Sequence, residues 1–113
     1  MKMVIYHNPK CSKSRQTLEI IKAKGVECEV IEYLKDPLSK ESLEVLAKKL
    51  AMRPRDFIRT KEQEFEELGL NLDDDEAVFG AMVRFPKLME RPIVTKGERG
   101  VIGRPPENVN ELF

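Results

Sequence analysis

Apolar and polar residues follow two spacings along the chain, which predict strands near both ends and helices between them. The apolar run of residues 3–6 predicts a buried strand. Apolar positions then recur at helical spacing over residues 11–24, and Gly25 stands where a helix C-terminus is expected. Residues 26–34 alternate at period two and predict a second strand, parallel to the first across a right-handed crossover.

The middle of the chain has a helical pattern that short stops interrupt. Ser39 is the expected N-cap of a helix that continues to about Met52. A short acidic helix is expected over residues 62–68, and a further helix ends before Pro86. These elements predict a helical insert over about residues 39–86. The apolar face of its first helix would carry Leu43, Leu46, Ala47 and Leu50.

Two more strands and a helix are expected after the insert. Residues 92–95 and 99–102 flank a loop of hairpin length and predict an antiparallel pair, and a C-terminal helix follows from Pro105. The order β-α-β, then helices, then β-β-α indicates an α/β chain with a thioredoxin-like fold. We therefore expect a mixed four-stranded sheet with a helical insert between its halves, in one domain of 113 residues.

Composition and charge exclude several classes of function. Apolar residues make up 41% of the chain and charged residues 35%, with a formal net charge of zero. This balance argues against binding to nucleic acid or to an anionic membrane. No long apolar run or signal-like segment is visible, so we expect a cytoplasmic location. Two cysteines and one histidine are too few for a disulfide scaffold or a familiar zinc site.

Cys11 is the candidate nucleophile, because it follows the first strand and a short turn and opens the first helix. Unpaired N–H groups and the helix dipole at this position favour an anion, so the thiol should ionise readily and could also hold an oxyanion nearby. Lys10, Lys13 and Arg15 add positive charge around the sulfur. The alternative is a buried structural cysteine, which acts as a small hydrophobic residue.

Three other residues bear on the chemistry of this thiol. Cys28 lies in a strand among glutamates and is expected to be inert. Ser14 occupies the second cysteine position of a C-x-x-C pair, so a resolving thiol must come from elsewhere. Its hydroxyl could bond the Cys11 thiolate or serve the first helical turn. His7 could orient or ionise the sulfur, or be a partly exposed turn residue.

Arginine positions separate this chain from one class of enzyme and suggest another kind of site. Position 17 is threonine, whereas a low-molecular-weight tyrosine phosphatase loop needs an arginine six residues after its cysteine. Arg59, Arg91 and Arg104 stand beside structural stops, and a guanidinium suits a tetrahedral oxyanion. Each of the three could equally be a surface or salt-bridged residue, because spacing does not bring them together.

The run from Tyr6 to Leu18 resembles the nucleophile segment of the glutaredoxin-dependent arsenate reductase (ArsC) family. The sequence Lys-Cys-Ser-Lys-Ser at residues 10–14 is closest to the ArsC-related branch called YfgD-like. Similar motifs follow in family order over essentially the whole chain, at residues 33–34, 58–59, 66–70, 90–94 and 102–106.

This resemblance implies roles for the candidate residues and a thiol-based mechanism. Arsenate would bind the arginines, and the thiolate would form an arsenate ester that glutathione and glutaredoxin reduce, with release of arsenite. Glutathione would be a co-substrate of a monomer that binds no metal, flavin or nicotinamide. The implied residues are Cys11 as nucleophile, Arg59, Arg91 and Arg104 as the anion site, His7 and Ser14 as support, and Pro92 after a cis peptide bond.

Two alternatives remain open at this point. A thiol oxidoreductase of the same fold could act on another oxyanion or on glutathionylated protein. A regulator resembling Spx, which binds RNA polymerase, would share the fold. Ser14 argues against the regulator because its redox switch is usually a C-x-x-C pair, and the Arg59 and Arg104 motifs favour an anion site.

Overall fold

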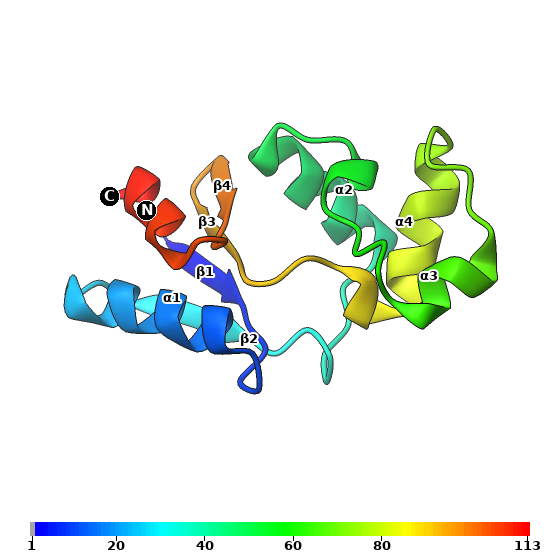
Figure 1. Ribbon diagram of the computed structural model, residues 1–113. Coiled ribbons are helices and arrows are strands. Elements are labelled where there is room, and N and C mark those ends of the chain that lie inside the picture. Colours follow the sequence, from blue (N-terminus) through cyan, green and yellow to red (C-terminus); the bar gives the residue numbers. More distant parts are fainter. Residues whose placement is uncertain (1) are drawn as a thin grey trace. The chain divides into compact units, whose positions relative to one another are not determined.

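The computed structural model describes residues 2–113 and contains a mixed four-stranded sheet with strand order β2-β1-β3-β4 (Figure 1). This arrangement confirms the predicted α/β class. The elements are β1 (Met3–Tyr6), α1 (Ser12–Ala23), β2 (Cys28–Ile31), α2 (Lys40–Leu50), η1 (Pro54–Asp56), α3 (Gln63–Leu68), α4 (Asp75–Arg84), η2 (Pro86–Leu88), β3 (Ile93–Lys96), β4 (Arg99–Ile102) and η3 (Pro106–Leu112), where η marks a 3-10 helix.

The chain divides into two compact units. The first combines Met1–Asp36 with Arg91–Phe113 and holds the sheet, α1 and η3. The second is Pro37–Glu90 and holds the remaining helices, so the predicted insert of about residues 39–86 falls within it.

Strand β1 is central in the first unit and has two different neighbours. It runs parallel to β2, with Met3 opposite Cys28, and antiparallel to β3, with Tyr6 opposite Ile93. The parallel pair confirms the expected parallel pairing of the first two strands. Strands β3 and β4 form the expected hairpin, in which Gly97 at φ 60° makes the turn.

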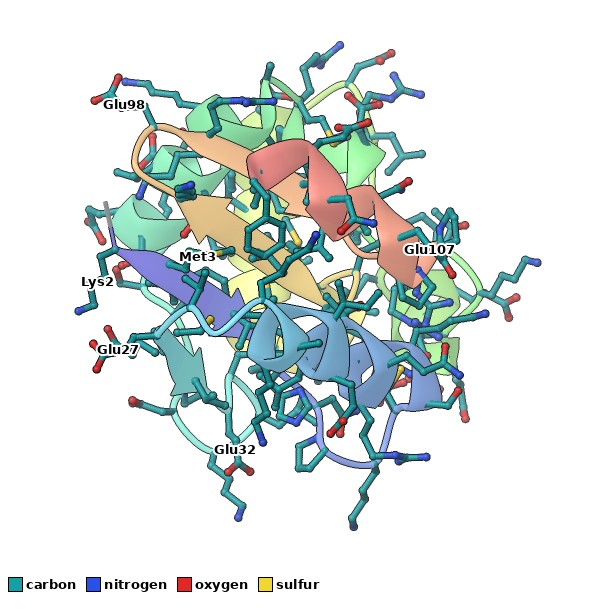
Figure 2. The ribbon with its side chains drawn as sticks, turned by 90° about the vertical axis from the view of Figure 1, so that its left-hand side faces the viewer. Lys2, Met3, Glu27, Glu32, Glu98 and Glu107 are labelled. Atoms are coloured by element: carbon teal, nitrogen blue, oxygen red, sulfur yellow. The ribbon has the colours of Figure 1, made fainter. Side chains whose placement is uncertain are left out.

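Helices α1 and η3 cover one face of the sheet and form a core with it (Figure 2). Each large apolar side chain buried in this way contributes roughly 1.5–3 kcal/mol to folding. The packing of α1 on the sheet fixes its direction, and therefore places its N-terminus just beyond the end of β1. The core residues are Met3, Ile5, Ile21, Val94, Val109 and Leu112.

Local signals explain the helices of the second unit. Ser39 caps α2 by accepting a hydrogen bond from the backbone N–H of Ser42, as its position predicts. Asp74 caps α4 through the N–H of Ala77, and α2 contacts α4. The buried face of α2 consists of the expected residues, Leu43, Leu46, Ala47 and Leu50.

The second strand and the C-terminal helix differ from the sequence prediction. Strand β2 spans Cys28–Ile31 rather than residues 26–34, because its partner β1 is four residues long and the chain turns at Glu32. The C-terminal helix is a 3-10 helix rather than an α-helix. Every helix in residues 2–113 is too short or too polar for a transmembrane span.

Candidate active site

Cys11 occupies the N-cap position of α1, at the end of a turn that backbone and side-chain hydrogen bonds hold. The backbone N–H of Cys11 donates to the carbonyl of Asn8 at 3.0 Å, and the N–H of Lys10 donates to Asn8 Oδ1 at 3.0 Å. Arg15 Nη1 reaches back to the carbonyl of Pro9 at 2.9 Å. Because Cys11 is extended (φ −96°, ψ 123°), its side chain is placed at the helix N-terminus.

The pKa of Cys11 lies below the usual 9.0, although its largest single influence acts in the other direction. Partial burial raises the pKa, and it is outweighed by the backbone N–H of Ser14, the side chain of Arg91 and the backbone N–H of Lys13. The sulfur makes no close capping hydrogen bond of the kind that a serine oxygen makes. The N–H groups of Ser14 and Lys13 at this helix N-terminus favour the thiolate over the thiol.

Arg91 and Arg104 meet at the sulfur because of the β3–β4 hairpin register. Arg91 precedes β3 and Arg104 follows β4, and the pairing of Ile93 with Ile102 brings both arginines to the same end of the hairpin. Arg104 Nη2 lies 3.7 Å from Cys11 Sγ, and its Nε donates to the carbonyl of Arg91 at 2.7 Å. At this separation a guanidinium also stabilises the thiolate by direct attraction.

Arg91 has a buried donor that lacks a protein partner within residues 2–113. Its Nε is buried and makes no hydrogen bond, while its side chain also contacts Cys11. An unpaired buried donor costs about 1–3 kcal/mol, and an oxyanion beside the sulfur can accept from it. The peptide bonds Arg91–Pro92 and Arg104–Pro105 are both cis, the second in a position that sequence analysis did not single out.

His7 and Ser14 form a buried pair beside the nucleophile. His7 Nδ1 lies 2.6 Å from Ser14 Oγ, and the backbone N–H of Asn8 donates to the same oxygen at 3.1 Å. Ser14 thus acts on Cys11 through its backbone N–H, while its hydroxyl joins the preceding turn to the helix. Burial is the largest cause of the lowered pKa of His7, so the imidazole is neutral near pH 7.

Arg59 lies in the second unit, where the structure describes it with its own neighbours. Its Nε donates to Glu62 at 3.1 Å, and its Nη1 lies 3.9 Å from Glu90. Its backbone N–H donates to the carbonyl of Leu88 at 2.6 Å. Two carboxylates thus neutralise this guanidinium, whereas Arg91 and Arg104 face the sulfur in the first unit.

A model of the ArsC family matches residues 6–112. The chain belongs to the ArsC family. The match includes the turn before Cys11 and ends with η3, so it spans most of the first unit, all of the second and every candidate site residue.

Relatives in the ArsC family are similar over nearly their full length. The chain is 50% identical to the uncharacterized protein YfgD of Escherichia coli K12, over 96% of this chain and 93% of that protein. It is 44% identical to a Haemophilus influenzae protein named arsenate reductase, over 100% of both. A solved structure of arsenate reductase from Vibrio cholerae aligns with a TM-score of 0.93, 44% identity, and coverage of 100% of this chain and 98% of that one.

Cys28 has a different environment from the cysteine at the N-terminus of α1 in this ArsC protein. Burial raises its pKa above 9.0, Glu29 raises it further, and the backbone N–H of Ile5 opposes both. Its Sγ lies 3.6 Å from the carbonyl oxygen of Glu29. Within residues 2–113, no group of three or more His, Cys, Asp or Glu side chains is placed to hold a metal ion.

Residues next to the two arginines at the sulfur also shape the site and were not expected from the sequence. A Cβ at Gly103 would lie 2.6 Å from Thr17 Oγ1 and 2.8 Å from Pro92 Cγ, so the chain approaches α1 closely just after the end of β4. Thr17 falls on the buried face of α1. A small polar residue at that helical spacing was a usable signal that another segment approaches the helix closely there. Asn108, which contacts the segment carrying Arg104, gave no signal in the sequence pattern.

Proposed function

We propose that this protein is an arsenate reductase that uses Cys11 as nucleophile and obtains electrons from glutathione and glutaredoxin. The observation that carries the proposal is the Cys11 sulfur, whose pKa is lowered and which lies beside Arg91 and Arg104. The unpaired Nε of Arg91 supports an oxyanion as the ligand. The full-length similarity to proteins named arsenate reductase supports arsenate as the oxyanion.

In the first step, arsenate binds between the two guanidinium groups and the N-terminus of α1. Fixed donors there replace water around the anion and stabilise the charge that develops during attack. The Cys11 thiolate attacks arsenic, an As–S bond forms, and one As–O bond breaks. The oxygen leaves as water after taking up two protons, so arsenic remains arsenic(V) in a thiol-arsenate ester.

In the second step, external thiols supply two electrons. Glutathione replaces a further arsenic-bound oxygen, which also leaves as water. A glutaredoxin thiolate then attacks the glutathione sulfur, a disulfide forms between them, and the electron pair of the broken As–S bond reduces arsenic(V) to arsenic(III). Hydrolysis of the remaining bond releases arsenite and restores Cys11. Ser14, in the place of a second cysteine, agrees with an external reductant.

Arg59 enters the proposal through the family resemblance, as the third arginine that binds arsenate. The ion pairs with Glu62 and Glu90 would have to share its guanidinium with the substrate. Charge-assisted hydrogen bonds contribute about 1.5–3 kcal/mol each. Loss of any one of the three arginines should therefore lower kcat/KM for arsenate by about 10- to 100-fold.

The test is arsenate-dependent NADPH oxidation, coupled through glutathione, glutaredoxin and glutathione reductase. The parent should turn over, Cys11→Ser should not, and Cys28→Ser is the matched cysteine control with nearly parental activity. Alanine variants at the three arginines should fold normally and show the reduced kcat/KM. Absence of turnover in a folded parent, at several arsenate concentrations, would disprove the proposed function.

A further inference from the structure

Asn108 holds the bend between β4 and η3 with one side-chain amide. Its Nδ2 donates to the carbonyl of Ile102 at 3.2 Å and to the carbonyl of Arg104 at 3.0 Å. A primary amide has two N–H donors, so it can satisfy both carbonyls at once. The N–H of Gly103 donates to the carbonyl of Pro92 at 2.9 Å, which fixes the middle of the bend.

The side chain that projects from this bend is that of Arg104. Its Nε donates to the carbonyl of Arg91 at 2.7 Å, and its Nη2 lies 3.7 Å from Cys11 Sγ. A guanidinium is planar and presents its donors in a fixed fork. Its position at the sulfur therefore depends on the backbone from which the side chain starts.

The amide of Asn108 is itself anchored by the core of the first unit. Its neighbour Val109 is fully buried, and Leu112 is 4% exposed in the same core. The backbone N–H of Asn108 donates to the carbonyl of Pro105 at 3.0 Å. Side chains that are supported by a packed element hold functional groups more precisely than side chains on an unsupported loop.

We propose that Asn108 is a positioning residue that fixes the Arg104 guanidinium at the Cys11 sulfur. The inference deepens the proposed function, because the same sulfur would attack arsenate. Asn108 does not touch the sulfur; it acts through the carbonyls of Ile102 and Arg104.

A displaced Arg104 should change the ionisation of Cys11. The groups that face the sulfur are the side chains of Arg91 and Arg104 and the backbone N–H groups of Lys13 and Ser14. Removing one of the two cations leaves the thiolate less stabilised, while the burial of the sulfur still opposes ionisation. The thiol pKa should then rise toward its usual value.

The experiment measures the rate of Cys11 alkylation by iodoacetamide against pH, with Cys28→Ser in every variant so that one thiol titrates. Asn108→Ala should raise the apparent thiol pKa by roughly half a unit to one unit, the equivalent of one lost hydrogen bond. Asn108→Leu, which keeps the size of the side chain, should do the same. Asn110→Ala, at an exposed position of η3, is the matched control and should leave the pKa unchanged.

A double-mutant cycle separates positioning from a general structural effect. In the Arg104→Ala background, Asn108→Ala should give no further rise in pKa, since the group that it positions is gone. An unchanged pKa in both folded Asn108 variants would overturn the inference. A full additional rise in the Arg104→Ala background would overturn it as well.

Thermal unfolding of each variant verifies that it is folded, and the titration needs no arsenate. A parent that fails to reduce arsenate would count against the proposed function and leave the titration fully interpretable. Conversely, if the parent is active and the Asn108 substitutions leave the Cys11 pKa unchanged, this inference alone would be contradicted. In an active parent, Asn108→Ala should also lower kcat/KM for arsenate several-fold.

Discussion

Nδ1 of His7 lies 2.6 Å from Oγ of Ser14, and this contact joins the turn after β1 to the first turn of α1. The two side chains are 6% and 0% exposed. The backbone N–H of Ser14 lowers the pKa of Cys11, so the hydroxyl serves the nucleophile by holding that N–H in place. The stability of this corner and the reactivity of the sulfur are therefore coupled through Ser14.

Ser14→Ala should lower the free energy of unfolding by about 1–3 kcal/mol, because it leaves buried donors and acceptors of His7 and Asn8 unpaired. Urea unfolding measures this loss. Ser12→Ala, at an exposed position in the same turn, is the control and should change stability by less than about 0.5 kcal/mol. A Ser14→Ala variant as stable as the parent would show that the pair contributes nothing to folding.

His7 should make stability depend on pH on the acidic side of neutrality. Burial first, and then Lys22 and Arg15, lower its pKa in the folded state below 6.5, against an opposing effect of Glu32. As pH falls below 6.5, the unfolded chain therefore binds a proton that the folded chain resists, and the free energy of unfolding decreases until the folded-state pKa is passed. The stability is fully present above 6.5.

His7→Gln removes the titrating imidazole, so comparison with the parent separates the contribution of His7 to the pH dependence of stability from the contribution of the carboxylates. In urea unfolding at a series of pH values, the parent should lose up to about 1.4 kcal/mol per pH unit more than the variant within that window. Equal slopes in the two proteins would contradict a buried, neutral histidine.

Cys11 and Cys28 should react at very different rates, since their pKa values shift in opposite directions from 9.0. Each unit of pKa difference changes the thiolate fraction near pH 7 by about tenfold. Iodoacetamide at neutral pH should therefore label Cys11 faster than Cys28, as peptide mass spectrometry can follow. Arg91→Ala should reduce the ratio of the Cys11 labelling rate to the Cys28 labelling rate. Faster labelling of Cys28 than of Cys11 in the parent would refute the assignment of Cys11 as the reactive thiol.

Gly103→Ala should destabilise the protein, whereas Gly80→Ala should not. The new Cβ at position 103 would lie 2.6 Å from the buried Thr17 Oγ1, and relief of that clash should cost about 1–3 kcal/mol. Position 80 in α4 has no atom within 4 Å of the added Cβ, so alanine there should stabilise by about 0.5–1 kcal/mol. Thermal unfolding compares the two, and similar effects would argue against the close approach.

Signals that act over a few residues were readable in the sequence. The N-cap at Ser39, the positive φ of Gly25 and the hairpin around Gly97 depend on the local backbone, and each was expected from residue type and spacing. The length of β2 was misjudged because a strand ends where its partner ends, and β1 is a separate segment. Periodicity alone also does not separate an α-helix from the 3-10 turns of η3.

In the candidate site, too, local features could be predicted from the sequence and long-range contacts could not. The placement of Cys11 after a strand and at the start of a helix was visible in the chain, because the helix N-terminus and its nucleophile are neighbours in sequence. The meeting of Arg91 with Arg104 depends on strand register, and the role of Asn108 depends on two carbonyls that it reaches only after η3 has packed.

The sequence by itself determined the order of elements, the position of the nucleophile and the resemblance to the ArsC family, since these follow from local patterns and short motifs. Only the tertiary structure decided which cations face Cys11 and that the hydroxyl of Ser14 bonds His7. Electrostatic attraction and hydrogen bonding act over a few ångströms in space. Residues 91 and 104 come within that range of residue 11 only through the folded sheet.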